Sequence, residues 1–90
     1  MAYKKQTKVE LNNECFKIST IYDELFDRYE TMIFKCDQFG DIADWSEIYI
    51  DYYLTEEEAE EGHKDCVKNI KEKLNMGTAN IYKQMLIKEN

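Results

Sequence analysis

The side chains best suited to chemistry in this chain are His63 and Cys66, which stand three positions apart. On a helix, residues at this spacing share a face and can hold one zinc ion between them. Cys15 and Cys36, the other two thiols of the sequence, could supply the remaining ligands. However, no Cys-x-x-Cys pair anchors such a site, and free cysteine is most often a small core residue. We therefore expect these four residues to fill the core, and we predict no bound metal and no other cofactor.

A run of glutamates offers carboxylates for hydrolysis or for a divalent cation, because five of the six residues in 56–61 are Glu. Catalytic carboxylates need burial or a partner that shifts their pKa, and this run suggests neither. Glutamates in the first turns of a helix more often complement the helix dipole. His63 could act as a general base with Ser19, Thr20 or a cysteine as nucleophile, but no nucleophile motif or phosphate-binding loop accompanies it. The sequence therefore favours a protein without catalytic activity.

The charge of the chain is unevenly distributed. The formal net charge is −7, and residues 37–65 contain eleven acidic side chains against Lys64 alone. Such a chain has little with which to neutralise phosphates, which argues against direct binding to nucleic acid.

No stretch approaches the roughly 18 apolar residues that a membrane-spanning helix needs, and no signal-peptide pattern follows Met1. Because three widely spaced cysteines make a poor disulfide framework, we expect the protein to act in a reducing cytoplasm.

Aromatic residues accompany the acidic region, and strand alternation cannot bury all of them. Tyrosine and tryptophan on a charged surface are typical of protein interfaces, although tyrosine also packs well in sheets. We predict a partner-binding surface made of acidic and aromatic residues. Its members are Asp41, Asp44, Trp45, Glu47, Tyr49, Asp51, Tyr53, Glu57 and Glu61.

Three segments with period-two patterning are expected to form the sheet that positions this surface: residues 16–22, 29–36 and 46–53. In the third segment, alternation places Ile48 and Ile50 on an apolar face and Tyr49 and Asp51 on an acidic, tyrosine-rich face. Gly40 and the flanking aspartates predict a turn between the second and third strands. The first 14 residues are expected to be a flexible or partly ordered arm.

An amphipathic helix is expected over residues 56–74. Thr55 and Glu58 form a capping box at its start, and Gly77 can supply the left-handed cap at its end. One apolar stripe should cover the sheet; its members are Ala59, His63, Cys66, Val67, Ile70 and Leu74.

The predicted fold class is α+β, with one domain over residues 1–90. A small antiparallel three-stranded sheet is covered by the amphipathic helix. A short C-terminal helix, residues 79–88, needs something to pack against, either its own domain or a second copy of the chain.

Three short segments, Ile18–Tyr22, Tyr29–Phe34 and Thr55–His63, carry a resemblance. In that order they resemble a set of small bacteriophage-encoded proteins of unassigned function. Those proteins carry an S-T-[IV]-[FY] strand, an E-T-M-[IV]-F strand and a T-x-x-E-A-x-x-G-H helix. One extra glutamate stands between Thr55 and Ala59 here, so the match is gapped, and it covers about residues 16–70. The resemblance implies a phage or prophage origin and transfers no functional residues.

Together these features predict a non-enzymatic phage accessory protein that binds and inhibits a host protein in the cytoplasm of the bacterial host. A defence protein or a nucleic-acid-handling protein with a basic patch is the expected partner, because acidic residues steer such encounters. The alternative is a small-molecule-binding or metal-binding protein, or an enzyme, with a pocket between helix and sheet near His63. A third alternative is a homo-oligomeric structural protein.

Overall fold

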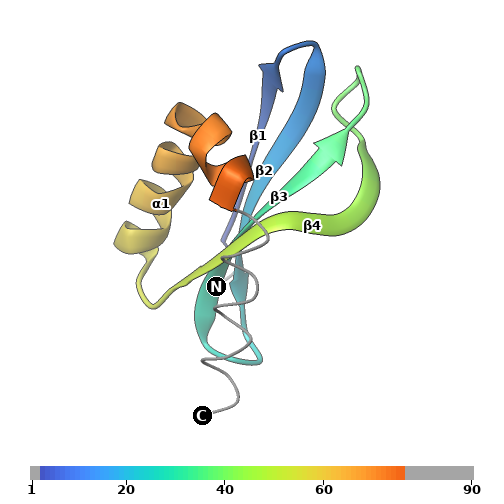
Figure 1. Ribbon diagram of the computed structural model, residues 1–90. Helices are drawn as coiled ribbons and strands as arrows, with labels where there is room; N and C mark the ends of the chain where they lie inside the picture. The colour runs from blue at the N-terminus through green and yellow to red at the C-terminus, as the bar shows by residue number, and fades with distance from the viewer. Residues whose placement is uncertain (1–2, 77–90) are drawn as a thin grey trace.

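The computed structural model describes residues 3–76, which form a four-stranded antiparallel sheet with helices packed against one face (Figure 1). The strands lie side by side in chain order: β1 (Lys4–Leu11), β2 (Glu14–Asp23), β3 (Arg28–Cys36) and β4 (Ile42–Tyr53). Helix α1 (Glu56–Lys68) follows β4, and a second helical segment covers residues 70–76. The predicted α+β class is confirmed, with four strands instead of three. Neither helical stretch within residues 3–76 is long and apolar enough to cross a membrane.

Strand β1 gives the first 14 residues more order than the predicted flexible or partly ordered arm. It pairs with β2 along its whole length, from Lys4 opposite Ile21 to Leu11 opposite Glu14. Asn12 and Asn13 form the intervening turn with φ values of 52° and 66°. Two consecutive positive φ angles are what a type I′ hairpin turn requires, and asparagine tolerates them. This Asn pair was the signal in the sequence that could have revealed the strand.

The core lies between the sheet and the helices, on what we call the helix-side face of the sheet; the opposite face is the open face. The predicted helical stripe is confirmed, since its residues are buried or packed against the core cluster. They meet side chains from three strands, and the cluster comprises Phe16, Ile18, Ile33, Tyr49, Cys66 and Ile70.

The start of α1 follows the predicted capping box in part. The Thr55 hydroxyl oxygen accepts from the Glu58 backbone N–H at 3.1 Å, which satisfies one donor of the first turn. The Glu58 carboxylate accepts from the Thr55 hydroxyl at 3.0 Å rather than reaching its backbone N–H.

The helix predicted over residues 56–74 is interrupted at Asn69, which has φ −118° and ψ 39°. The Asn69 N–H still donates to the Asp65 carbonyl at 2.8 Å, and its own carbonyl accepts from the Lys73 N–H at 3.1 Å. The chain therefore continues into the 70–76 segment with a change of direction (Figure 1). The predicted helix 79–88 lies outside the described residues.

Strand β4 does not have one packed apolar face and one exposed acidic face, because both Ile48 and Tyr49 pack in the core. Tyr49 is 1% exposed and lies in the core, and the alternation that places it there puts Asp51 on the helix-side face as well. Ile50 faces the open side, opposite Met32. Both faces of the sheet carry apolar residues, so alternation identified the strand without fixing which face meets the helix.

The open face is partly covered by the chain itself. The β3–β4 register shifts between Ile33 and Lys35, and an irregularity of this kind bends a strand. Figure 1 shows the resulting curve of β4. Trp45, near the start of β4, packs against Phe34 with ring centroids 5.5 Å apart. This contact covers part of Phe34, which is only 6% exposed although it lies on the open face.

Candidate functional site

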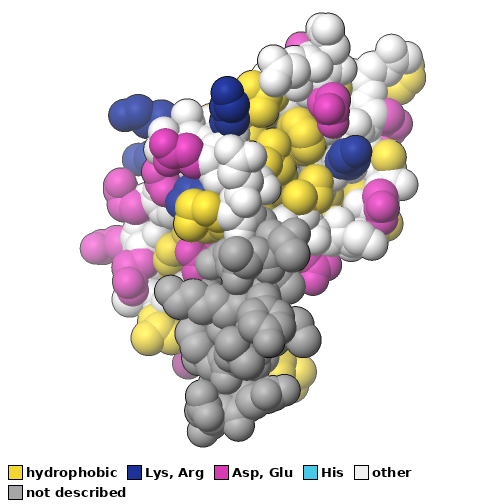
Figure 2. Space-filling view, viewed as in Figure 1, with side chains coloured by type: hydrophobic (Ala, Val, Ile, Leu, Met, Phe, Trp, Pro, Cys, Tyr) yellow, Lys and Arg dark blue, Asp and Glu magenta, His cyan; other side chains and the backbone are white. Residues whose placement is uncertain are grey.

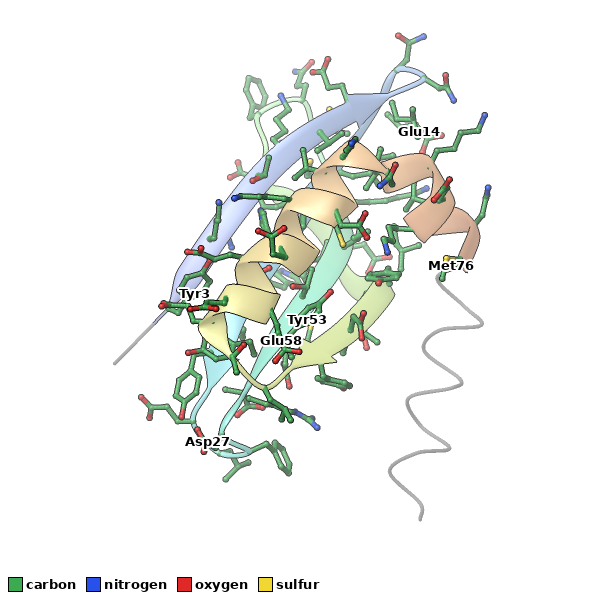
Figure 3. The ribbon with its side chains drawn as sticks, turned by 90° about the vertical axis from the view of Figure 1, so that its left-hand side faces the viewer. Tyr3, Glu14, Asp27, Tyr53, Glu58 and Met76 are labelled. Atoms are coloured by element: carbon green, nitrogen blue, oxygen red, sulfur yellow. The ribbon has the colours of Figure 1, made fainter. Side chains whose placement is uncertain are left out.

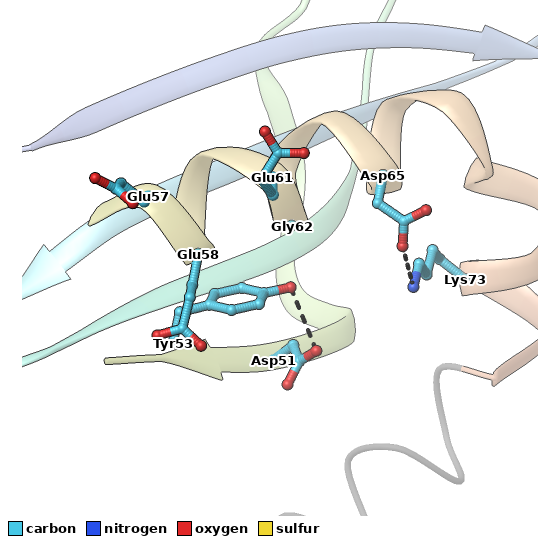
Figure 4. A pocket seen from close by; sticks show the side chains of 8 residues that line it. All are labelled: Asp51, Tyr53, Glu57, Glu58, Glu61, Gly62, Asp65 and Lys73. Atoms are coloured by element: carbon cyan, nitrogen blue, oxygen red, sulfur yellow. Dashed lines mark hydrogen bonds and ion pairs between the residues drawn. The ribbon is translucent and has the colours of Figure 1, made fainter. Parts of the chain in front are cut away.

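A groove of about 690 Å³ runs between α1 and the C-terminal end of β4 (Figure 4). Five carboxylates and one lysine line it, and we call it the acidic groove. Its residues are Asp51, Tyr53, Glu57, Glu58, Glu61, Gly62, Asp65 and Lys73. In the space-filling view, acidic side chains gather over α1 (Figure 2). The groove is therefore a concentrated negative surface at one edge of the sheet.

Asp51 is held in place at the β4 side of the groove. Its Oδ2 accepts from the hydroxyls of Tyr49 and Tyr53, both at 3.3 Å, and its Oδ1 accepts from the Tyr52 backbone N–H at 2.9 Å. Burial raises the pKa of both Tyr49 and Tyr53, and the charge of Asp51 raises these pKa values further. The two hydroxyls therefore stay protonated at neutral pH and remain donors to the carboxylate.

Gly62 allows the ring of Tyr53 to lie against the backbone of α1. A Cβ atom at Gly62 would overlap the Cζ and hydroxyl oxygen of Tyr53, and Figure 4 shows the ring beneath this part of the helix. Glycine inside a helix costs about 1 kcal/mol relative to alanine. The close approach of the ring gives a structural reason for a glycine in the middle of α1.

Lys73 is paired within the groove. Its ammonium lies 2.7 Å from the Asp65 carboxylate, across the change of direction at Asn69. The hydrogen bond from Lys73, supported by one from the Asn69 side chain, lowers the pKa of Asp65, and the same contact raises the pKa of Lys73. Glu57 and Glu61, four residues apart on α1, remain exposed at the rim.

The opposite flank of α1 holds a smaller hollow of about 290 Å³ beside β1, and Figure 3 shows α1 lying between the β1 and β4 sides of the sheet. Three lysines surround it, and we call it the basic hollow. Its residues are Lys5, Thr7, His63, Lys64, Val67 and Lys68.

His63 closes the inner end of the basic hollow and is 1% exposed. Its Nε2 lies 2.8 Å from the Thr7 hydroxyl, and its Nδ1 lies 2.7 Å from the Thr20 hydroxyl, which in turn meets the Thr31 hydroxyl at 2.7 Å. Burial lowers the pKa of His63, and the nearby Lys5 charge lowers it further. A neutral imidazole has one donor and one acceptor nitrogen, and both have partners here.

The residues considered for zinc do not come together. The β2–β3 register places Cys15 and Cys36 opposite each other on the open face, whereas His63 and Cys66 lie on the helix side. Burial raises the pKa of the Cys66 thiol to about 12, which keeps it protonated. Within residues 3–76, no group of three or more His, Cys, Asp or Glu side chains could hold a metal ion.

The residues predicted to bind a partner divide between the two faces of the sheet. Asp51, Tyr53, Glu57 and Glu61 line the acidic groove. The remaining residues lie elsewhere: Trp45 and Glu47 line a hollow of about 390 Å³ on the open face, Asp41 and Asp44 are exposed near the start of β4, and Tyr49 is in the core. The prediction that Tyr49 belongs to a binding surface is therefore wrong, because its ring is enclosed by the sheet and helix.

Four residues of the acidic groove were missed from the sequence: Glu58, Gly62, Asp65 and Lys73. The four-residue spacing of Glu57, Glu61 and Asp65 along one helix flank was a usable signal for Asp65.

No family model, curated protein or solved structure matches this chain. The resemblance to bacteriophage proteins therefore stays a prediction, and any functional assignment depends on the site itself.

Proposed function

We propose that the protein is a non-enzymatic binding protein whose acidic groove receives a basic segment of a partner protein. The observation that carries this proposal is the collection of five carboxylates around one groove, to which the described residues contribute one lysine, Lys73, itself paired with Asp65. At the rim, Glu61 lies 4.0 Å from Lys64. A lysine or arginine of a partner would add positive charge to this acidic surface.

The groove offers both long-range attraction and a fixed contact surface. Its negative charge would steer a basic partner toward it and speed association. Tyr53 is held by Gly62 and Asp51, so its ring gives an ordered apolar surface against which the stem of an arginine or lysine can pack. Arginine suits the site best, because its planar guanidinium can donate to two carboxylate oxygens at once.

The three phage-like motifs suggest the biological setting of this interaction. In a phage-infected or prophage-carrying cell, the partner would be a host protein whose basic surface handles nucleic acid or serves in defence. Occupying that surface would inhibit the host protein by competing with its anionic ligand.

The test is affinity capture from a bacterial host lysate with three matched baits. These are the wild type, a groove variant with Glu57→Lys and Glu61→Lys, and a control variant with Glu24→Lys and Glu72→Lys. Both variants change the net charge equally, but Glu24 and Glu72 are exposed and lie outside the groove lining. We expect one basic protein to be retained by the wild type and the control and lost by the groove variant.

The captured protein should then be titrated against all three baits. We expect the groove variant to bind at least about tenfold more weakly, equivalent to about 1.4 kcal/mol, and the control to bind within about threefold of the wild type. Equal binding by the two variants would show that total charge, and not the groove, governs the interaction.

The alternative function, a small-molecule site near His63, has one observation in its favour. Lys5, Lys64 and Lys68 converge around the basic hollow, so a small organic anion is the ligand class that its charge suits. Inorganic phosphate can serve as the probe in an amide NMR titration. Saturable shifts at Thr7 and Lys68 that are absent from a Lys5→Ala, Lys68→Ala variant would favour this function; shifts spread evenly over the surface would exclude it.

A further inference from the structure

Cys15 and Cys36 are directly opposite each other in the neighbouring strands β2 and β3. Opposed residues of an antiparallel pair have Cα atoms about 4.5–5.5 Å apart, and disulfides span Cα distances of about 4.4–6.8 Å. Opposed residues also project from the same face of a sheet. Because Phe16, the residue after Cys15, lies in the core, both thiols project from the open face.

The two thiols interact, and they differ in access to solvent. Cys15 is half-buried, whereas Cys36 is 9% exposed. Burial raises the pKa of the Cys36 thiol, and the adjacent Cys15 raises it further, against the opposing effect of Lys17 and Lys8. A reagent from solvent therefore reaches Cys15 first, and Cys36 is placed to react with whatever forms there.

We propose that Cys15 and Cys36 are a redox pair that forms a reversible disulfide with a low-molecular-weight disulfide as oxidant. The Cys15 thiol releases its proton to water, and its sulfur attacks one sulfur of the oxidant, which breaks the S–S bond and releases one small thiol. The Cys36 sulfur, after losing its own proton, then attacks the Cys15 sulfur of the mixed disulfide and releases the second small thiol. Two protein thiols are thereby oxidised and one small disulfide is reduced to two thiols.

This site is separate from the acidic groove, since neither thiol lines it. The disulfide would join β2 to β3 next to the Asn12–Asn13 turn and just before the turn over residues 37–40. The β3–β4 register is irregular at this end of the sheet. Oxidation would therefore fix the end of the sheet from which β4 starts to curve.

Cys66 provides an internal control for thiol reactivity. It is 0% exposed on the helix side of the sheet, and burial raises its pKa to about 12. In the folded chain it should neither react with the oxidant nor exchange with the open-face pair.

The experiment treats the folded protein with oxidised glutathione at neutral pH, quenches it in acid and measures the intact mass and the disulfide-linked peptides. We expect the wild type to lose the mass of two hydrogen atoms, to yield one Cys15–Cys36 linked peptide and to keep one of its three thiols available for alkylation after denaturation. A reducing agent should restore all three thiols. Cys66→Ser should give the same linked peptide as the wild type.

Two further variants define the order of attack. Cys36→Ser should stop at a glutathione adduct on Cys15, and Cys15→Ser should form no intramolecular disulfide, with circular dichroism confirming that each variant is folded. The proposal is overturned if the wild type keeps all three thiols, if it accumulates the Cys15 adduct without passing it to Cys36, or if the linked peptide contains Cys66. All three outcomes are measured on the wild-type protein, so the test remains decisive even if a variant does not fold.

Discussion

The two flanks of α1 differ in the burial and hydrogen bonding of their polar side chains. In the basic hollow, His63 is enclosed and both of its ring nitrogens meet threonine hydroxyls. In the acidic groove, Glu57 and Glu61 are exposed at the rim while Asp51 is fixed behind them by tyrosine hydroxyls. Gly62 and His63 are adjacent in α1 but face different flanks: Gly62 lies against Tyr53 in the acidic groove, and His63 bonds to threonines in the basic hollow. One flank uses its polar atoms to hold the fold, and the other presents them to solvent.

The contrast follows from what burial demands of each group. A buried polar group without a hydrogen bond destabilises a protein by about 1–3 kcal/mol, so an interior histidine must be satisfied locally. Exposed carboxylates carry no such requirement and contribute little to stability. Substitutions on the two flanks should therefore separate stability from binding.

The largest expected effect is that of His63→Ala. The substitution leaves a cavity and removes the partner of the Thr7 and Thr20 hydroxyls, so we expect a loss of about 2–4 kcal/mol in unfolding free energy. Urea denaturation measures this loss. Lys64→Ala, at the next and exposed position, should change stability by less than about 0.5 kcal/mol. A loss below about 1 kcal/mol for His63→Ala would mean that the threonine network does not anchor α1.

A smaller effect is expected from pH, through the same side chain. The pKa of His63 is lowered below its ordinary 6.5 in the folded chain by burial and then by Lys5. The unfolded chain therefore binds more protons just below pH 6.5, so stability is complete above that pH and declines as the pH falls through it.

Unfolding free energies measured between about pH 7.5 and 5.5 test this expectation, because the chain has one histidine and carboxylates titrate mainly lower. A His63→Gln variant keeps a hydrogen-bonding side chain but cannot titrate, and its stability should be flat over this range. A decline of the same size in both proteins would assign the pH dependence to other groups.

Some of the features on which these predictions depend could be predicted from the sequence, and others could not. The helical stripe and the Thr55 cap were predictable, because spacing and capping chemistry are local properties. Strand β1 was not predicted over its full length because its first half is polar on both faces, with Lys4 and Lys8 on one and Lys5 and Thr7 on the other. Its apolar signal is confined to Val9 and Leu11, which pack against the core. The β1–β2 register places Lys5 and Thr7 on the helix-side face, where both line the basic hollow.

The sequence predicted which types of residue form the candidate site, but not the faces of the sheet on which they lie. The acidic and aromatic residues of the region were recognised, yet Tyr49 and Trp45 were assigned to one surface although β4 places them apart. Their separation depends on the curve of β4 and on the register shift near Phe34, which come from pairing between strands. Such pairing is a property of the folded sheet, and no local pattern in the sequence encodes it.

Gly62→Ala tests whether the shape of the acidic groove matters apart from its charge. The new methyl group should displace the Tyr53 ring, while the better helix propensity of alanine, about 1 kcal/mol, offsets the lost packing. We expect a net stability change within about 1 kcal/mol and altered NMR shifts at Tyr53 and Asp51. In a Tyr53→Ala background, the same substitution should stabilise the protein by about 1 kcal/mol. Equal effects in both backgrounds would show that the ring and Gly62 are not coupled.

The smallest stability effect is expected for Glu57→Gln combined with Glu61→Gln. Both side chains are exposed, so the unfolding free energy should change by about 0.5 kcal/mol or less, while affinity for a basic partner should fall. Glu24→Gln with Glu72→Gln is the matched control and should leave both quantities unchanged. A large loss of stability in the groove variant would show that these carboxylates support the fold, contrary to the division between the two flanks.

The order of the strands has a consequence for how the chain assembles. Because every strand pairs with its neighbour in sequence, the sheet can form as successive hairpins with short loops, and topologies of low contact order fold fast. Docking of α1 is different, since the contact between Thr7 and His63 joins residues 56 positions apart and carries a larger loop-closure entropy. We therefore expect the hairpins to precede the helix, so that the acidic groove comes into existence in the last step of folding.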